Sequence, residues 1–312
     1  MRDRSVRISA GLRGAQADQG FTLIETLVAL TVLLVVMGTV MSSMIQFSQT
    51  QTMVWNRANM HGAVRSATEL LQQEVGQAGR VSLPPGMLMT TAVTAAGVHT
   101  VTVTSTANIF PTERLVIDAG NNEETVTVTT VDSSTSFTAD FVLTHAASVP
   151  VAVRGGFASG VVPTTMANGS TGGLLKIYGD INGDDNMVYV EYVCDTAGGT
   201  LSRNMMPFKS GSKPAVNAGQ VLLTNVLPNP GGTPCFTYEQ KIVGGSTYVI
   251  NVAITLTSQT QVRDRVTRQF QTETKALLNV APRNVFEAWQ LASMGAYKRI
   301  QPMPPSVLSL LP

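Results

Sequence analysis

The position of Glu25 is the feature of this 312-residue sequence that most needs an explanation, because this acidic residue lies inside a run of apolar residues. The run begins at Phe21 and continues to about Ile45, which is long enough to cross a bilayer. An ionised carboxylate in that setting costs roughly 2.5–3.5 kcal/mol even on forgiving insertion scales. We therefore expect this acid to have a function, such as pairing with a cation. The alternative is an acid that reaches the aqueous interface from a simple membrane anchor.

A second set of oxygen-bearing side chains lies in the segment DINGDDNMVYVE, residues 180–191. Their spacing is that of a calcium loop, in which carboxylate and amide oxygens surround the ion. The five candidate ligands are Asp180, Asn182, Asp184, Asn186 and Glu191. However, the sixth position is Asp185, where such a loop needs glycine, and a strand pattern follows instead of a helix. The sequence therefore favours an acidic β-turn over a calcium loop. Calcium, the less favoured alternative, is the sole cofactor that the sequence suggests.

The remaining polar residues give little support for catalysis. The three histidines, His61, His99 and His145, lack metal-ligand spacing, and each is expected at the surface. No G-x-S-x-G elbow, Walker loop or paired Cys/His signature occurs. The net charge of +1 gives no electrostatic case for nucleic-acid binding. The sequence therefore predicts a protein that is not an enzyme.

The residues before the apolar run indicate the compartment. Residues 1–20 contain four arginines, a positive flank that is expected to stay in the cytoplasm. A secretory signal peptide has its small-residue cleavage site after the apolar region, whereas here the small residue, Gly20, precedes it. Any cleavage at this position would remove the charged leader and leave the apolar helix in the mature protein.

The hexapeptide Gly20-Phe-Thr-Leu-Ile-Glu25, with about 20 apolar residues after it, resembles the class III leader of type IV pilins and type II secretion pseudopilins. In that family, a prepilin peptidase cleaves after the glycine and methylates the new N-terminal phenylalanine. The resemblance implies cleavage between Gly20 and Phe21 and N-methylation of Phe21. It also implies that Glu25 of one subunit approaches the terminal amine of its neighbour during assembly. At about 4 Å and an effective dielectric near 20, such a pair contributes on the order of 4 kcal/mol before desolvation.

The helical pattern continues beyond the apolar run, until Pro84-Pro85-Gly86 ends it. Residues 21–46 are predicted as the transmembrane half of one long helix, and residues 47–80 as its periplasmic amphipathic half. In the second half, apolar residues recur at helical spacing and are expected to face the domain that follows. These residues are Met53, Met60, Val64, Ala67, Leu71, Val75 and Ala78.

From about residue 90 the hydrophobic pattern changes to the alternation that is typical of β-strands. Residues 90–155 predict a small inserted β-module, and residues 156–283 predict an antiparallel sheet. Residues 284–312 predict a C-terminal helix and a Pro-rich tail. The segment LLQQEVGQAGR at the end of the helical pattern resembles the corresponding segment of PilW-like minor pilins. So does the order of an acidic turn, a V-x-Y strand, the segment Leu201-Ser-Arg203 and a terminal R-x-F…P-R-N strand. In those proteins a long helix packs on an antiparallel sheet. The expected fold class is therefore α+β and type IV pilin-like, with the β-module as an insertion.

Cys194 and Cys235 are the two cysteines of the sequence. Many pilins close a C-terminal loop with a disulfide, so the resemblance implies a bond between them in a domain outside the cytoplasm. For a loop near 40 residues, the chain-entropy relation gives a stabilisation of about 4 kcal/mol. Two buried free thiols are the alternative.

The resemblance implies a PilW-like minor pilin of the bacterial inner membrane, with its C-terminal domain in the periplasm. It would help to initiate type IV pilus assembly in a tip or priming complex. The expected partners are prepilin peptidase, other minor pilins, the major pilin and the inner-membrane assembly platform, with a tip adhesin as a further candidate. No nucleic acid is expected. Two alternatives stay open: a J-type pseudopilin of type II secretion, and a membrane-anchored surface-binding protein that does not polymerise.

Overall fold

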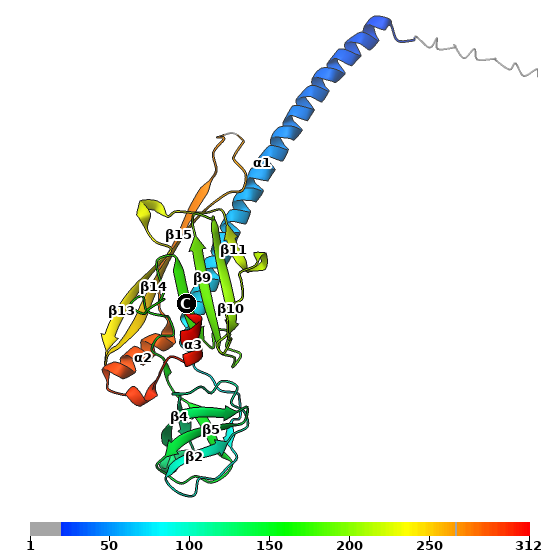
Figure 1. Cartoon of the computed structure of the whole chain (residues 1–312). Coiled ribbons are helices and arrows are strands. Elements are labelled where there is room, and N and C mark those ends of the chain that lie inside the picture. Colours follow the sequence, from blue (N-terminus) through cyan, green and yellow to red (C-terminus); the bar gives the residue numbers. More distant parts are fainter. Residues whose placement is uncertain (1–19, 266) are drawn as a thin grey trace, which may run out of the picture. The chain divides into compact units, whose positions relative to one another are not determined.

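The computed structural model describes residues 20–265 and 267–312 (Figure 1). The leader predicted for residues 1–20 lies, apart from Gly20, outside the described residues. The chain forms two compact units, one that ends at Val54 and one that comprises Trp55–Pro312. Each unit is described by itself below.

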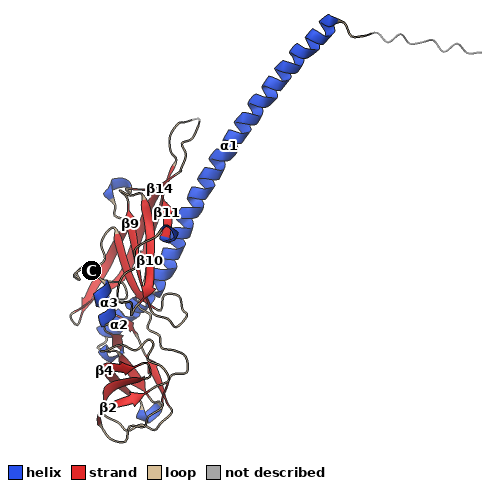
Figure 2. Cartoon of the chain, turned by 45° about the vertical axis from the view of Figure 1, so that its right-hand side comes forward, coloured by secondary structure: helices blue, strands red, loops and turns tan. Residues whose placement is uncertain are grey.

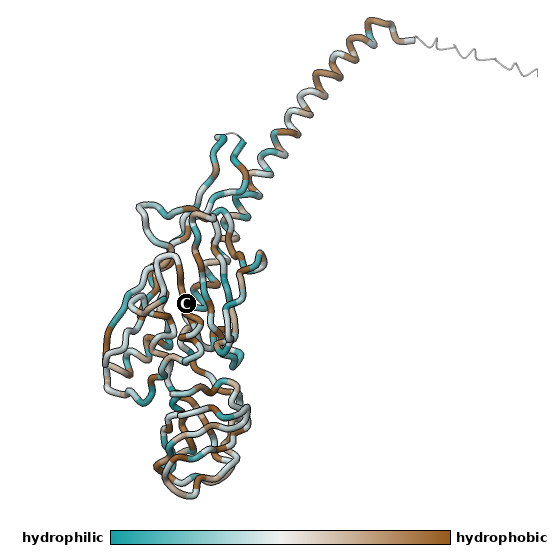
Figure 3. Tube along the Cα trace, in the orientation of Figure 1, coloured by the Kyte–Doolittle hydropathy of each residue, from teal (hydrophilic) through white to brown (hydrophobic). Residues whose placement is uncertain are grey.

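The described part of the first unit consists mainly of the N-terminal part of helix α1 (Leu23–Gln77), which is apolar around its circumference. An 18-residue window of this helix has a mean hydropathy of 2.3, and none of it is buried. Figure 3 shows the same stretch as predominantly hydrophobic. A helix of this length and composition can cross a membrane. The long N-terminal helix of the expected fold class is thus confirmed.

In the second unit, α1 buries one face. The predicted apolar residues from Met60 to Ala78 are all buried, and their spacing of three and four residues places them on one side of the helix. Gly79 follows in the left-handed region, with φ of 82°, a conformation that favours glycine. Its N–H donates to the Tyr178 carbonyl at 2.9 Å, and a Cβ atom on Gly160 would collide with its backbone. These close contacts fix the end of the helix against the sheet.

Two four-stranded antiparallel sheets pack with this face of α1 in one hydrophobic core. One sheet has the order β11-β10-β9-β8, and in the other β14 pairs with β12, β13 and β15. The strands are β8 (Leu174–Gly179), β9 (Val188–Asp195), β10 (Thr200–Pro207), β11 (Val221–Thr224), β12 (Val226–Leu227), β13 (Phe236–Val243), β14 (Ser246–Gln259) and β15 (Thr272–Val280). The antiparallel sheets confirm the β part of the expected α+β, pilin-like fold class.

Two C-terminal helices add further buried contacts to these sheets (Figure 2). Helix α2 (Arg283–Ser293) shares a hydrophobic cluster with Tyr248 and Ile250 of β14. Helix α3 (Pro305–Leu310) shares another cluster with Tyr189 of β9. As a result, β9 is buried on both faces, in agreement with a sequence in which Glu191 is the one charged residue before Asp195.

Six antiparallel strands in the β-module region close into a barrel. Their order is β1-β6-β3-β4-β5-β2, and Met89 of β1 bridges Val103, just beyond β2, so the last strand returns to the first. The Thr90 N–H donates to the Thr102 carbonyl at 2.8 Å at this closure. The strands are β1 (Leu88–Met89), β2 (Gly97–Thr102), β3 (Arg114–Ile117), β4 (Glu124–Ser133), β5 (Ser136–Phe141) and β6 (Val149–Val153). Closure leaves few unpaired strand edges, so most backbone N–H and C=O groups of the strands form hydrogen bonds within the barrel itself.

The valines that alternate in the sequence fill the interior of the barrel. Val101, Val103, Val126 and Val128 are each at most 3% exposed and share a cluster with Phe137. Because neighbouring strands are antiparallel, the chain enters before β1 and leaves after β6 at the same end of the barrel. The opposite end therefore carries the three loops 90–96, 118–123 and 142–148.

Candidate functional site

Glu25 lies in the first turn of α1, where it forms a capping box with Thr22. The Thr22 backbone N–H and hydroxyl donate to Glu25 Oε2 at 3.0 and 2.9 Å. In return, the Glu25 N–H donates to Thr22 Oγ1 at 3.4 Å. Thr22 is thus the N-cap residue, which explains why the helix begins at Leu23.

The side chains around Glu25 form an uncovered apolar surface. Phe21, Leu23 and Ile24 are 82%, 83% and 68% exposed, respectively. Such a surface needs lipid or other apolar helices to cover it. A carboxylate enters such an apolar setting more easily together with a cation than alone.

The predicted cleavage bond lies outside the helix. Gly20 and Phe21 are exposed and precede the helical residues. A peptidase needs an accessible, non-helical peptide, and the structure places one here. Cleavage at this bond and methylation of Phe21 stay predictions.

A buried ion pair, which the sequence analysis missed, joins the other end of α1 to the sheet. Arg203 of β10 donates from Nη2 to Glu74 Oε1 at 2.5 Å and from Nε to Oε2 at 3.1 Å. The Tyr192 hydroxyl of β9 also donates to Glu74, and burial together with this carboxylate raises the pKa of Tyr192. The available signal was that Glu74 stands three residues after Leu71, and so on the buried face of the helix.

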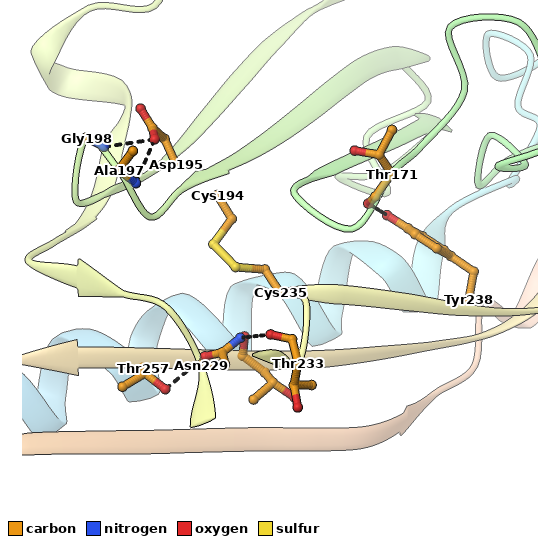
Figure 4. Close-up of a disulfide and its surroundings, with 11 residues drawn as sticks. Thr171, Cys194, Asp195, Ala197, Gly198, Asn229, Thr233, Cys235, Tyr238 and Thr257 are labelled. Atoms are coloured by element: carbon orange, nitrogen blue, oxygen red, sulfur yellow. Dashed lines mark hydrogen bonds between the residues drawn. A yellow bond between two sulfur atoms is a disulfide. The ribbon is translucent and has the colours of Figure 1, made fainter. Parts of the chain in front are cut away.

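The structure contains the Cys194–Cys235 disulfide (Figure 4). It connects β9 of one sheet to the residue before β13 of the other, and the two Cα atoms are 6.4 Å apart. After Cys194, Asp195 Oδ1 accepts two backbone N–H groups of the following turn at 3.0 and 2.8 Å. Before Cys235, the Asn229 side chain accepts from the Thr257 hydroxyl at 2.8 Å. The disulfide thus links two loops that hydrogen bonds already order.

The loop proposed for calcium is a hydrogen-bonded turn. Asp180 is fully buried, and its Oδ2 lies 3.3 Å from the Arg80 Nε, within ion-pair distance although without hydrogen-bond geometry. Asp180 Oδ1 accepts from the Asp184 N–H at 3.1 Å, and Asp184 Oδ1 accepts from the Asn186 N–H at 3.1 Å. Asn182 is exposed. Asp180, the first of the candidate ligands, therefore has a guanidinium as its cationic partner.

Glu191, the fifth candidate ligand, belongs to a different buried cluster. Its Oε1 accepts from Lys213 Nζ at 2.7 Å and from the Tyr189 hydroxyl at 2.5 Å, and Lys176 Nζ is 3.5 Å away. Burial lowers the pKa of Lys176, which also donates to the Leu311 carbonyl. The cluster ties the C-terminal segment to the sheet, and the five candidate ligands are not brought together. Within residues 20–265 and 267–312, no group of three or more His, Cys, Asp or Glu side chains is arranged to hold a metal.

The prediction that His145 lies at the surface was wrong. This residue is 2% exposed, with Asp118 Oδ2 at 3.2 Å from Nδ1 and Glu124 Oε1 at 2.7 Å from Nε2. The Ala119 backbone N–H and the His145 ring lower the pKa of Asp118. Both ring nitrogens have a carboxylate partner, so the imidazole links the loops at the far end of the barrel and has no nitrogen left for a metal.

The end of the barrel where the chain enters and leaves is attached to the rest of the second unit by polar contacts. The buried Asn108 amide donates to two backbone carbonyls outside the barrel, at 3.1 and 2.7 Å. Gln301 accepts the Arg114 N–H at 2.9 Å and donates to the Arg114 carbonyl at 2.8 Å. It belongs to β16 (Ile300–Gln301), which pairs in parallel with β7 (Gly156–Phe157) directly after the barrel. The barrel is thus held at this end, while its other end carries loops alone.

Comparison with known proteins gives one match. Residues 16–41 match the family model described as the prokaryotic N-terminal methylation motif. The matched segment includes Gly20, Phe21, Glu25 and the first part of α1. No curated protein and no solved structure matches the chain. The motif supports a structural protein of the type IV pilin and pseudopilin type, anchored in a membrane and in contact with other pilus components.

Proposed function

We propose that the chain is a minor pilin of the PilW-like kind, which is processed between Gly20 and Phe21 and then helps to start a type IV pilus. One observation carries this proposal: the methylation motif coincides with an exposed apolar helix that has Glu25 in its first turn. A plain membrane anchor would need neither the motif nor the acid. The disulfide supports a periplasmic second unit, because such bonds persist in oxidising compartments.

The geometry of Glu25 suits pairing between subunits. Both donations from Thr22 go to Oε2, and among the described hydrogen bonds Oε1 accepts none. Removal of the leader would give Phe21 a terminal ammonium. Glu25 Oε1 of one subunit can accept a hydrogen bond from the Phe21 ammonium of a neighbouring subunit. Glu25 Oε2 meanwhile keeps its hydrogen bonds to Thr22, so the helix cap stays intact. Assembly then needs no local unfolding at the start of α1.

The position of the barrel supports a place at the tip of the filament. The barrel follows the C-terminal end of α1 in the chain, whereas the apolar span precedes the second unit. A bulky barrel inserted between the helix and the sheets is best accommodated where no further subunit has to stack. The partners in a tip complex would be other minor pilins and the major pilin.

A J-type pseudopilin of type II secretion is the second candidate, because the matched motif is common to pilins and pseudopilins. The same pairing of Glu25 with a terminal amine would serve both. Genes for pilus minor pilins beside this one would favour the first candidate, and secretion genes would favour the second.

The experiment that tests the proposal compares three variants in cells that make filaments. Glu25→Ala is expected to insert into the membrane and to be processed, but to be absent from sheared filaments. Thr22→Val removes the cap but keeps the charge, so it is expected to enter filaments. Glu69→Ala removes an acid that is 61% exposed on the second unit and serves as the matched control. Equal amounts of Glu25→Ala and wild-type protein in filaments would contradict the proposal.

A further inference from the structure

The connection between β14 and β15, of which the structure describes residues 260–265 and 267–271, is the end of a hairpin, here called the arginine hairpin. The Thr260 N–H donates to the Gln271 carbonyl at 2.9 Å and extends the strand pairing. Asp264, the one acid of this segment, accepts from the Thr267 N–H at 3.0 Å and from Gln271 Nε2 at 3.1 Å. Its N–H also donates to the Gln269 carbonyl at 2.8 Å. The aspartate therefore serves to shape the turn.

The arginine hairpin gathers positive charge beside apolar side chains. Arg263, Arg265 and Arg268 are exposed, and none of them takes part in the ion pairs of the described residues. Three arginines and one aspartate give the segment a net charge of +2, compared with +1 for the whole chain. Val262 and Phe270 are 52% and 37% exposed, and the Arg263 guanidinium lies 5.0 Å from the centre of the Phe270 ring. Cationic and apolar groups together are typical of interfacial membrane contacts.

The arginine hairpin lies beside the first turns of α1 in the second unit. Ser258, Gln259 and Gln261 line a cavity of about 160 Å³ together with residues of α1, and His61 contacts Glu273 at the base of the hairpin. The α1 residues of this cavity are Asn56, Asn59, Met60 and Ala63. The chain between this contact and the apolar run is short, since residues 46–55 span about 15 Å as helix. The cationic groups thus belong to the part of the second unit from which the chain continues into its membrane span.

We propose that the arginine hairpin docks on anionic phospholipid headgroups of the membrane that holds the chain's own apolar helix. A guanidinium group can donate two parallel hydrogen bonds to two oxygens of one phosphate. Each basic residue close to an anionic bilayer strengthens membrane association about fivefold. Val262 and Phe270 enter the headgroup region beside them. Docking holds the second unit against the membrane before assembly. The proposal requires an inserted α1 but no filament, so it stands apart from the proposed function.

The test uses the full chain in vesicles of phosphatidylcholine, with or without phosphatidylglycerol. A Thr267→Cys variant, with the native disulfide intact, carries an environment-sensitive dye at the hairpin. In vesicles with phosphatidylglycerol, the dye emission is expected to shift to the blue and to be quenched by brominated lipid, and high salt is expected to reverse both effects. Replacing Arg263, Arg265 and Arg268 by alanine is expected to reduce the docked-to-undocked ratio about a hundredfold.

Two further variants separate docking from general charge effects. Replacing the three arginines by lysine keeps the charge and is expected to keep most of the signal. Removing three exposed cations elsewhere in the second unit, in Lys241→Ala/Lys298→Ala/Arg299→Ala, is expected to leave it unchanged. The same dye signal with and without phosphatidylglycerol would overturn the proposal. Equal losses in the two alanine triples would overturn it as well, and the wild-type lipid dependence decides the matter if a triple variant fails to fold.

Discussion

Replacing Arg203 is expected to destabilise the second unit more than replacing its partner Glu74. The Glu74 side chain is 5% exposed, and Arg203→Ala leaves its carboxylate with the Tyr192 hydroxyl as the remaining described donor. Breaking a buried ion pair in this way costs about 3–5 kcal/mol, and a stranded carboxylate belongs at the upper end. Glu74→Ala leaves a guanidinium that is 19% exposed and can reach water, so its cost is expected to lie at about 3 kcal/mol or below.

The assay is chemical denaturation of the full chain in detergent micelles, followed by circular dichroism. The control is Glu69→Ala, which breaks an ion pair whose side chains are 75% and 61% exposed and is expected to cost no more than about 0.5 kcal/mol. The triple variant Glu74→Leu/Arg203→Met/Tyr192→Phe is expected to recover most of the loss, because it also removes the hydroxyl that donates to Glu74 and the three apolar residues need no partners.

This reasoning fails if Glu74→Ala is the more destabilising of the two single variants. It also fails if both single variants cost no more than the Glu69→Ala control. Either result would mean that the pair is solvated in solution and does not clamp α1 to the sheet.

Three further predictions concern other parts of the second unit. Replacing Cys194 and Cys235 by serine is expected to lower the free energy of unfolding by about 4 kcal/mol in denaturant titrations, because it reopens a loop with a sequence separation of 41; equal stability would show that the bond is dispensable. Burial raises the pKa of Glu113 well above 4.5, so the folded protein favours the neutral acid at this position. The free energy of unfolding is therefore expected to decrease as the pH rises above 4.5, because the unfolded chain releases the proton more easily. Glu113→Gln is therefore expected to gain in melting temperature relative to wild type as pH increases, and a constant difference would refute this. Calcium or a chelator is expected to leave the melting temperature unchanged, because Arg80 faces Asp180, whereas a calcium-dependent rise would restore the metal hypothesis.

Much of the fold was accessible from local patterns. The apolar run, its amphipathic continuation and the alternating strands each depend on residues close in sequence, and they predicted a long helix followed by β-structure. The resemblance of the Gly20–Glu25 hexapeptide to pilin leaders added the pilin-like class. Closure of the barrel could not be predicted from the sequence. It depends on a bridge between Met89 and Val103 whose register no local pattern specifies. The two-sided burial of β9 likewise depends on α3, far away in the chain.

The candidate site divides in the same way. Gly20, Phe21 and Glu25 are readable because their signal is one contiguous motif. The Glu74–Arg203 pair joins residues 129 positions apart, so it appears only once α1 lies on the sheet. The burial of His145 also depends on residues distant in the sequence, Asp118 of another loop and Glu124 of β4, which no pattern around the histidine indicates.

The most direct measurement is the intact mass and N-terminal sequence of the protein purified from membranes of cells that contain prepilin peptidase. We expect the mature chain to begin with N-methylated Phe21, with the apolar helix and Glu25 retained. A chain that still begins with Met1, or one that is cleaved after Ile45, would contradict the pilin assignment.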